Sequence, residues 1–82
     1  MSDHPGHLLR EMLRTRPESQ AELADMCGVS RFTINQIVGS RRAITPYVAL
    51  RLEHVGYGEA DDWVVLQARH DLALARNRAP DG

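Results

Sequence analysis

The sequence has no lysine, a single cysteine and no long apolar run among its 82 residues. One cysteine, Cys27, excludes an internal disulfide framework and fits a reducing cytosol, so we expect a cytoplasmic protein. No apolar run approaches the roughly 18–20 residues that a membrane span needs. Residues 1–7 have neither the basic start nor the apolar core of a signal peptide. The sequence therefore predicts a protein that does not contact a membrane.

No stretch alternates apolar and polar residues over enough positions for a strand. A glycine-rich phosphate-binding loop follows a strand, so we expect no such loop in this sequence. Cys27 and the histidines lack the spacing of metal ligands, and a buried cysteine behaves as a small hydrophobe rather than as a nucleophile. A chain of this length forms one domain, 1–82, with little room for a substrate cleft. We therefore expect no enzyme, no cofactor and no metal.

The net charge of −1 argues at first against a nucleic-acid partner, but the charges are segregated along the chain. Residues 17–29 and 53–63 carry acids and no arginine, whereas residues 30–52 carry arginines and no acid. Arginine holds phosphate and guanine in a planar bidentate fork, although an arginine-only composition also follows from a genomic codon bias. The positive segment is the candidate for nucleic-acid contact.

Apolar periodicity predicts an all-α chain of five helices. Leu8, Leu9, Met12 and Leu13 form the stripe of the first helix, which Pro17 ends, and residues 1–6 are expected to form a loose lead-in. The second helix is predicted over 20–27, with Ser19 as its N-cap and Gly28 as the glycine that closes it. The third helix follows the N-cap Ser30 and runs to about residue 38. The last two begin at Thr45-Pro46 and near residue 60, the fifth running to about 76 before a frayed tail.

The segment 20–39 contains two short helices joined through Gly28. Small Ala24 allows a close crossing, and Val29, Ile34 and Ile37 anchor the pair at one angle. This pattern predicts a helix-turn-helix, whose second helix can enter the major groove of DNA. The alternative is an ordinary helical hairpin without a nucleic-acid role.

If Ile34, Ile37 and Val38 face the core, the opposite side of the same helix faces outward. The predicted base-contacting residues on that side are Arg31, Phe32, Asn35 and Gln36. Arg31 can pair with guanine O6 and N7, and Asn35 or Gln36 with adenine N6 and N7. Phe32 either packs on a thymine methyl group or folds back onto neighbouring helices.

Phosphate contacts are predicted at helix starts, where free backbone N–H groups favour anions, and in the basic loop that follows the third helix. The predicted residues are Gln20, Ser30, Thr33, Ser40, Arg41 and Arg42. A solvated loop is the alternative for Arg41 and Arg42. Because a monomer has few cations, we expect a homodimer on palindromic operator DNA, with strongly salt-dependent binding.

The sequence resembles the HigA-type antitoxins, within the Xre-like helix-turn-helix class, from His4 to Arg76. The resemblance is carried by His4-Pro5-Gly6, Leu8-Leu9-Arg10-Glu11, Ser19-Gln20-x-Glu22-Leu23-Ala24, Gly28-Val29-Ser30-Arg31, Ile34-Asn35-x-Ile37-Val38, Ala49-Leu50-Arg51-Leu52 and Trp63-x-x-Leu66-Gln67. It implies a lambda-repressor-like fold, repression of the protein's own operon, and neutralisation of a HigB-like toxin that cleaves mRNA. A stand-alone Xre-type repressor, as in prophages, is the alternative, and a pure protein-interaction module is a further one.

The fifth helix carries two apolar stripes, and a helix that buries one face in its own monomer needs only one. One stripe comprises Val64, Val65, Ala68, Leu72 and Ala75. The other comprises Trp63, Leu66, Ala73 and Leu74, interrupted by His70. We predict that Trp63, Leu66, His70, Ala73 and Leu74 form an interface with a second copy or with the toxin. The alternative is that a small core simply wraps the helix.

Overall fold

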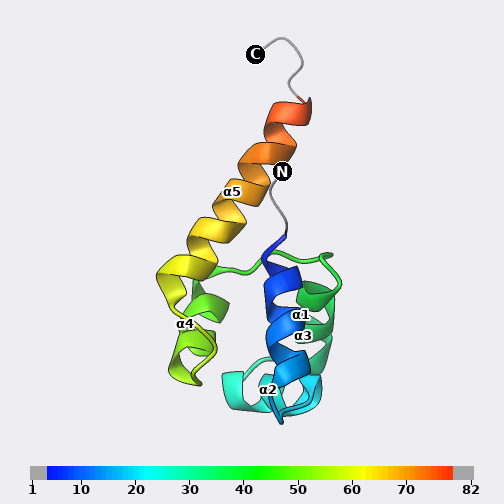
Figure 1. The fold of residues 1–82 in the computed structure, drawn as a ribbon, viewed down its shortest axis with the longest axis vertical. Helices are drawn as coiled ribbons and strands as arrows, with labels where there is room; N and C mark the ends of the chain where they lie inside the picture. The colour runs from blue at the N-terminus through cyan, green and yellow to red at the C-terminus, as the bar shows by residue number, and fades with distance from the viewer. Residues whose placement is uncertain (1–3, 79–82) are drawn as a thin grey trace.

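The computed structural model describes residues 4–78, which form five helices and no strand. The helices are α1 (Pro5–Thr15), α2 (Gln20–Cys27), α3 (Arg31–Val38), α4 (Pro46–His54) and α5 (Ala60–Arg78). Figure 1 shows α1 to α4 gathered into one body, with the long α5 extending away from it. The all-α, five-helix prediction is confirmed. Within residues 4–78, no helix is long and apolar enough to cross a membrane.

The helix boundaries follow the predicted capping signals. Ser19 and Glu22 form a complete capping box, in which each side chain accepts a hydrogen bond from the backbone N–H of the other residue. The hydroxyls of Ser30 and Thr45 cap α3 and α4 in the same way as Ser19 caps α2. Gly28 ends α2 in the left-handed conformation, with φ of 71°. These local signals account for the angle between α2 and α3.

The first helix begins earlier than predicted, because residues 4–6 are not a loose lead-in. His4 is the N-cap of α1, and its Nδ1 accepts a hydrogen bond of 2.8 Å from the N–H of Gly6. Pro5 occupies the first helical position, and His4, Pro5 and Gly6 are all buried. A Cβ atom on Gly6 would overlap the carbonyl oxygen of Ile37, so α1 crosses the end of α3 at backbone contact. The remaining lead-in residues, 1–3, and the predicted tail, 79–82, lie outside the described residues.

The core lies between the helices and contains most of the predicted inward-facing residues, but Leu8 of the predicted first stripe is exposed. Its buried apolar members are Leu9, Leu23, Ala24, Cys27, Ile34, Ile37, Ile44, Val48, Ala49, Leu52, Tyr57, Ala60 and Trp63. The Tyr57 side chain was not predicted to be buried. It is 1% exposed, and its hydroxyl donates a hydrogen bond of 2.5 Å to Glu18. Burial, together with this bond, raises the pKa of Tyr57 to about 12.

The two stripes of α5 are arranged differently from the prediction. Trp63 is 1% exposed, and its Nε1 donates a hydrogen bond of 2.6 Å to the Tyr57 carbonyl. One turn further on, the buried Gln67 accepts a bond of 2.8 Å from the N–H of Ile44. These bonds turn the Trp63 side of α5 toward the body and leave Val64, Val65 and Leu72 on the exposed side. The assignment of Trp63 to a partner interface is therefore wrong.

Candidate nucleic-acid interface

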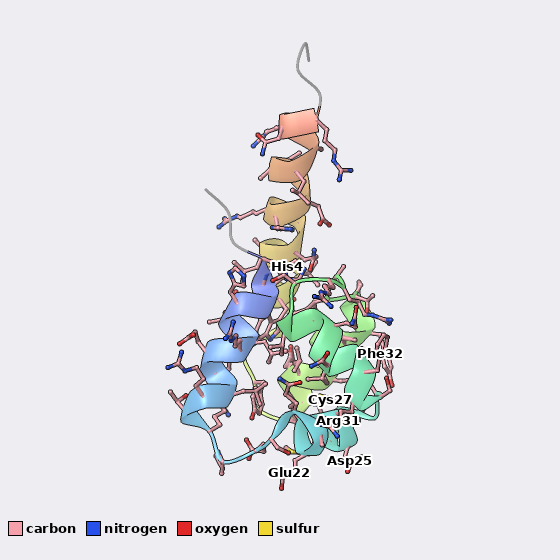
Figure 2. The ribbon with its side chains drawn as sticks, turned by 90° about the vertical axis from the view of Figure 1, so that its right-hand side faces the viewer. His4, Glu22, Asp25, Cys27, Arg31 and Phe32 are labelled. Carbon is pink, nitrogen blue, oxygen red and sulfur yellow. The ribbon has the colours of Figure 1, made fainter. Side chains whose placement is uncertain are left out.

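The outward face of α3 carries the predicted polar and aromatic residues. Ile34 and Ile37 are fully buried, so the opposite side of this helix is turned to solvent. Arg31, Phe32 and Asn35 are exposed, and Gln36 is half-buried. Phe32 is 60% exposed, so its ring is not buried in the core. Figure 2 shows Phe32 at the outer edge of the molecule.

Hydrogen bonds within the helix-turn-helix hold this face in place. The Ser30 hydroxyl accepts a bond of 3.0 Å from the N–H of Thr33, and the two hydroxyls lie 2.9 Å apart. Asn35 Nδ2 donates a bond of 3.3 Å to Gln20 Oε1. The start of α2 is therefore linked directly to the middle of α3, so that Gln20 and Asn35 lie side by side.

The basic loop after α3 is anchored at both of its ends. The N–H of Arg41 donates a bond of 2.8 Å to the Gln36 carbonyl, and Ile44 is bonded to Gln67 and only 2% exposed. Between these anchors Arg42 is exposed, and its guanidinium carbon lies 5.6 Å from the centroid of the Phe32 ring. The loop therefore places its arginines beside the outer face of α3.

The hydroxyl of Ser40 is turned inward. The residue has φ of 60°, and its hydroxyl oxygen is buried with no hydrogen-bond partner in the described part of the chain. Its N–H is already bonded to the Ile37 carbonyl. This orientation of the hydroxyl does not support a phosphate contact, so the contact predicted for Ser40 stays a prediction.

The positive charge of the segment 30–52 is concentrated on three side chains. Arg51 is half-buried and bonded to backbone carbonyls of α2, so it is not part of the outer surface. Arg31, Arg41 and Arg42 are exposed, and none of them has an acid partner within residues 4–78. Three unpaired guanidinium groups around a polar helix face form a surface that attracts anions.

A second surface lies between α1 and α5. A groove of about 810 Å³ is lined by His4, Pro5, His7, Leu8, Glu11, Leu66, Arg69, Leu72, Ala73 and Arg76. Leu8 and Leu72 are 46% and 49% exposed, and Leu74 further along α5 is 43% exposed. The sequence analysis did not assign α1 to this surface.

Two histidines join α1 to α5 at one end of this groove. The rings of His4 and His70 meet edge to face, with centroids 4.8 Å apart. Burial of the imidazole, and secondarily the nearby His70, lower the pKa of His4 below its usual value of 6.5. His70 Nδ1 is buried and has no hydrogen-bond partner among residues 4–78. The edge-to-face geometry is that of a packing contact between the two helices. Among residues 4–78, no group of three potential metal ligands forms.

Two short helices joined by a left-handed glycine, the second with a polar outer face, define a helix-turn-helix protein. No protein-family model matches the chain. Virulence-associated protein I of Dichelobacter nodosus is 41% identical to it over 73 residues, which are 88% of this chain and 68% of that protein.

Solved structures are similar over nearly the whole chain. Antitoxin GraA matches with a TM-score of 0.91 and 34% identity, covering 99% of this chain and 89% of that one. Pseudomonas aeruginosa antitoxin HigA, solved with the higBA promoter, matches with a TM-score of 0.90 and 36% identity, covering 98% and 88%. The chain belongs to the HigA family of antitoxins, as its sequence motifs predicted. Membership of this family of DNA-binding proteins also confirms that it is not an enzyme.

Proposed function

We propose that the chain is an antitoxin that binds its own operator DNA as a dimer, represses its operon and neutralises a toxin. The observation that carries the proposal is the exposed face of α3, with Arg31, Phe32 and Asn35 beside Arg41 and Arg42, which have no acid partner within residues 4–78. A similar protein, the antitoxin HigA of Pseudomonas aeruginosa, was solved with promoter DNA. Membership of the HigA family and the exposed basic surface around α3 therefore support the same function.

Base recognition is assigned to the outer face of α3 in the major groove. Arg31 stands in the first turn of α3, and the N-terminal residues of a recognition helix reach the base edges. Its guanidinium would pair with guanine O6 and N7, while the amides of Asn35 and Gln36 would pair with adenine. The exposed ring of Phe32 would meet a thymine methyl group.

Backbone contacts are assigned to both sides of this helix. Arg41 and Arg42 lie in the loop beyond the end of α3, where they would bind phosphates that flank the major groove. Gln20, Ser30 and Thr33 lie at the starts of α2 and α3, where N–H groups without helical partners favour anions. These contacts would give affinity without sequence preference.

Dimerisation is assigned to the groove between α1 and α5, with a second copy of the chain as its occupant. Of the interface residues proposed from the sequence, Leu66 and Ala73 line this groove, and the structure adds Leu8 and Leu72. His70 packs on His4 at the end of the groove, and Leu74 is exposed on α5 but does not line it. The groove carries Glu11 as well as Arg69 and Arg76, so its charges are complementary to those of the same surface on a two-fold-related copy. A dimer would present two copies of α3 to a palindromic operator.

The toxin partner is proposed from family membership. A HigB-like ribonuclease that cleaves mRNA is the toxin that the sequence motifs imply, and the exposed part of α5 is the alternative contact for it. Co-expression with the adjacent gene tests this assignment. The proposal requires that the neighbouring product arrests growth alone and that co-expression of this chain restores growth.

Operator binding is tested by titrating the DNA upstream of the chain's own gene at several salt concentrations. Arg31→Ala is expected to weaken binding to this DNA by about 1–3 kcal/mol and to relax the preference at one base position. Arg41→Ala is expected to weaken binding to every DNA and to flatten the dependence on salt. Binding of the unaltered protein that is equally weak on operator and unrelated DNA would contradict the proposal.

A further inference from the structure

The side chains of Phe32 and Arg42 meet on the outer surface although ten residues separate them. The guanidinium carbon of Arg42 lies 5.6 Å from the ring centroid, within the range of a cation–π interaction. The ring is 60% exposed, so its position is not explained by burial in the core. We propose that Phe32 is a positioning residue, whose ring holds the Arg42 guanidinium at the edge of α3 so that it binds a phosphate of the DNA backbone. This inference rests on the proposed DNA-binding function.

The backbone around Arg42 supports this role. The loop is fixed before Arg42 by the bond from the N–H of Arg41 to the Gln36 carbonyl, and after it by the bond from Ile44 to Gln67. What remains free is the long side chain of Arg42, which would lose rotamer freedom on binding a phosphate. A ring beneath the guanidinium limits this freedom before DNA arrives, so less of it is lost in the complex.

Arg42 has the Phe32 ring as its partner and no acidic side chain beside it within residues 4–78. Residues 30–52 contain no acid, and Arg42 forms no ion pair within the described part of the chain. The cation–π contact leaves the N–H groups at the guanidinium edge available for a phosphate, whereas a carboxylate partner would compete with the phosphate for them. An aromatic ring is therefore a suitable support for a phosphate-binding arginine.

Arg41 provides a matched control within the same loop. It is exposed like Arg42, but within residues 4–78 its guanidinium lies over no aromatic ring. Both arginines are proposed to bind phosphates, so Arg41→Ala and Arg42→Ala should weaken binding to a similar degree. Only the effect of Arg42→Ala should depend on Phe32.

The experiment measures the affinity of the full chain for its operator and for an unrelated duplex over a range of salt concentrations. Phe32→Leu keeps an apolar side chain for a thymine methyl group but removes the aromatic face, and Phe32→Tyr keeps the face. Phe32→Leu is expected to weaken binding about two- to fivefold on both duplexes, as loss of an exposed cation–π contact implies. It should also flatten the salt dependence, and Phe32→Tyr should match the unaltered protein in both respects.

Double variants separate positioning from an independent contact. Phe32→Leu combined with Arg42→Ala should bind no more weakly than Arg42→Ala alone, whereas its effect should multiply with that of Arg41→Ala. If the effects of Phe32→Leu and Arg42→Ala also multiply, or if Phe32→Leu loses affinity only for operators with one particular thymine, the proposal is overturned. In those cases operator binding by the unaltered protein still stands. Absence of salt-dependent operator binding by the unaltered protein overturns the proposed function itself, and this inference with it.

Discussion

At the residue scale, the guanidinium of Arg51 ties α4 to the end of α2. Its Nε donates a hydrogen bond of 2.9 Å to the Cys27 carbonyl, and Nη2 donates one of 3.5 Å to the Met26 carbonyl. The last carbonyls of a helix have no partner within their own helix, so a charged donor stabilises them. Arg51 is therefore a structural residue within an otherwise outward-facing basic segment.

Substitutions of Arg51 and Arg31 should distinguish a residue that stabilises the fold from one that binds DNA. Arg51→Ala removes a charged donor from two backbone carbonyls at the end of α2 and is expected to lower the free energy of unfolding by about 1.5–3 kcal/mol. Arg31→Ala, at an exposed position of the same segment, should leave this free energy nearly unchanged while it weakens operator binding. Urea denaturation and DNA titration of both variants check this. Equal stability of the two variants would contradict the role of Arg51.

The lowered pKa of His4 predicts a pH-dependent stability. The folded state holds this imidazole neutral below its usual pKa of 6.5, so its contribution is present above pH 6.5 and is lost as the pH falls through the lowered value. His70 and His7 oppose its protonation, whereas Asp71 favours it. His4→Asn keeps a side-chain acceptor for the N–H of Gly6 but does not titrate. The free energy of unfolding between about pH 7 and pH 5 should therefore vary less in His4→Asn than in the unaltered protein. An unchanged profile would assign the pH dependence to other groups.

At the scale of the helices, the caps determine where each element begins. The Ser30 hydroxyl satisfies the N–H of Thr33 at the start of α3. Ser30→Ala is expected to cost about 1 kcal/mol of unfolding free energy. Thermal unfolding measures this loss, with Ser2→Ala, at a position outside the predicted helices, as the control for a serine substitution as such. A loss no larger than that of the control would show that the cap contributes little.

The close crossing of α1 and α3 requires a glycine at position 6. A methyl group on Gly6 would overlap the Ile37 carbonyl oxygen, so Gly6→Ala must move α1 away from α3. We expect it to cost about 1–3 kcal/mol or more, as overpacked positions do. Gly39→Ala is the matched control, because its Cβ would lie 3.4 Å from the Asn35 carbonyl oxygen and its φ is −82°. Equal stabilities of the two variants would contradict the close crossing.

At the scale of the whole molecule, α5 extends beyond the body and leaves apolar side chains exposed (Figure 1). A charge within the proposed interface should prevent dimerisation, because it would be buried without a partner. Leu72→Glu is expected to give a monomer that binds the operator more weakly. Val64→Glu is the control, since Val64 is exposed on the same helix but does not line the groove. Light scattering after size-exclusion chromatography gives the mass, and a dimer formed by Leu72→Glu would exclude the groove as the interface.

Much of this protein was determined by its sequence alone, because the relevant forces are local. Capping hydroxyls, prolines and a left-handed glycine act within one turn of their helix, so the boundaries of α2, α3 and α4 could be predicted. The outward direction of Arg31, Phe32 and Asn35 followed from the apolar period of α3. The His4 cap was not predicted, because an imidazole serves as an N-cap only when its acceptor nitrogen is held toward the helix.

Only the tertiary structure decided which of the two apolar stripes of α5 faces the body. Both stripes have the helical period, and the choice depends on where Trp63 and Gln67 find hydrogen-bond partners in Tyr57 and Ile44. The same holds for Ser40, which precedes two exposed arginines in a loop, and for Arg51 on α4, because the polar atoms of both side chains are turned inward. Packing and hydrogen bonding between distant segments determine these orientations, and neither is encoded in the period of a single helix.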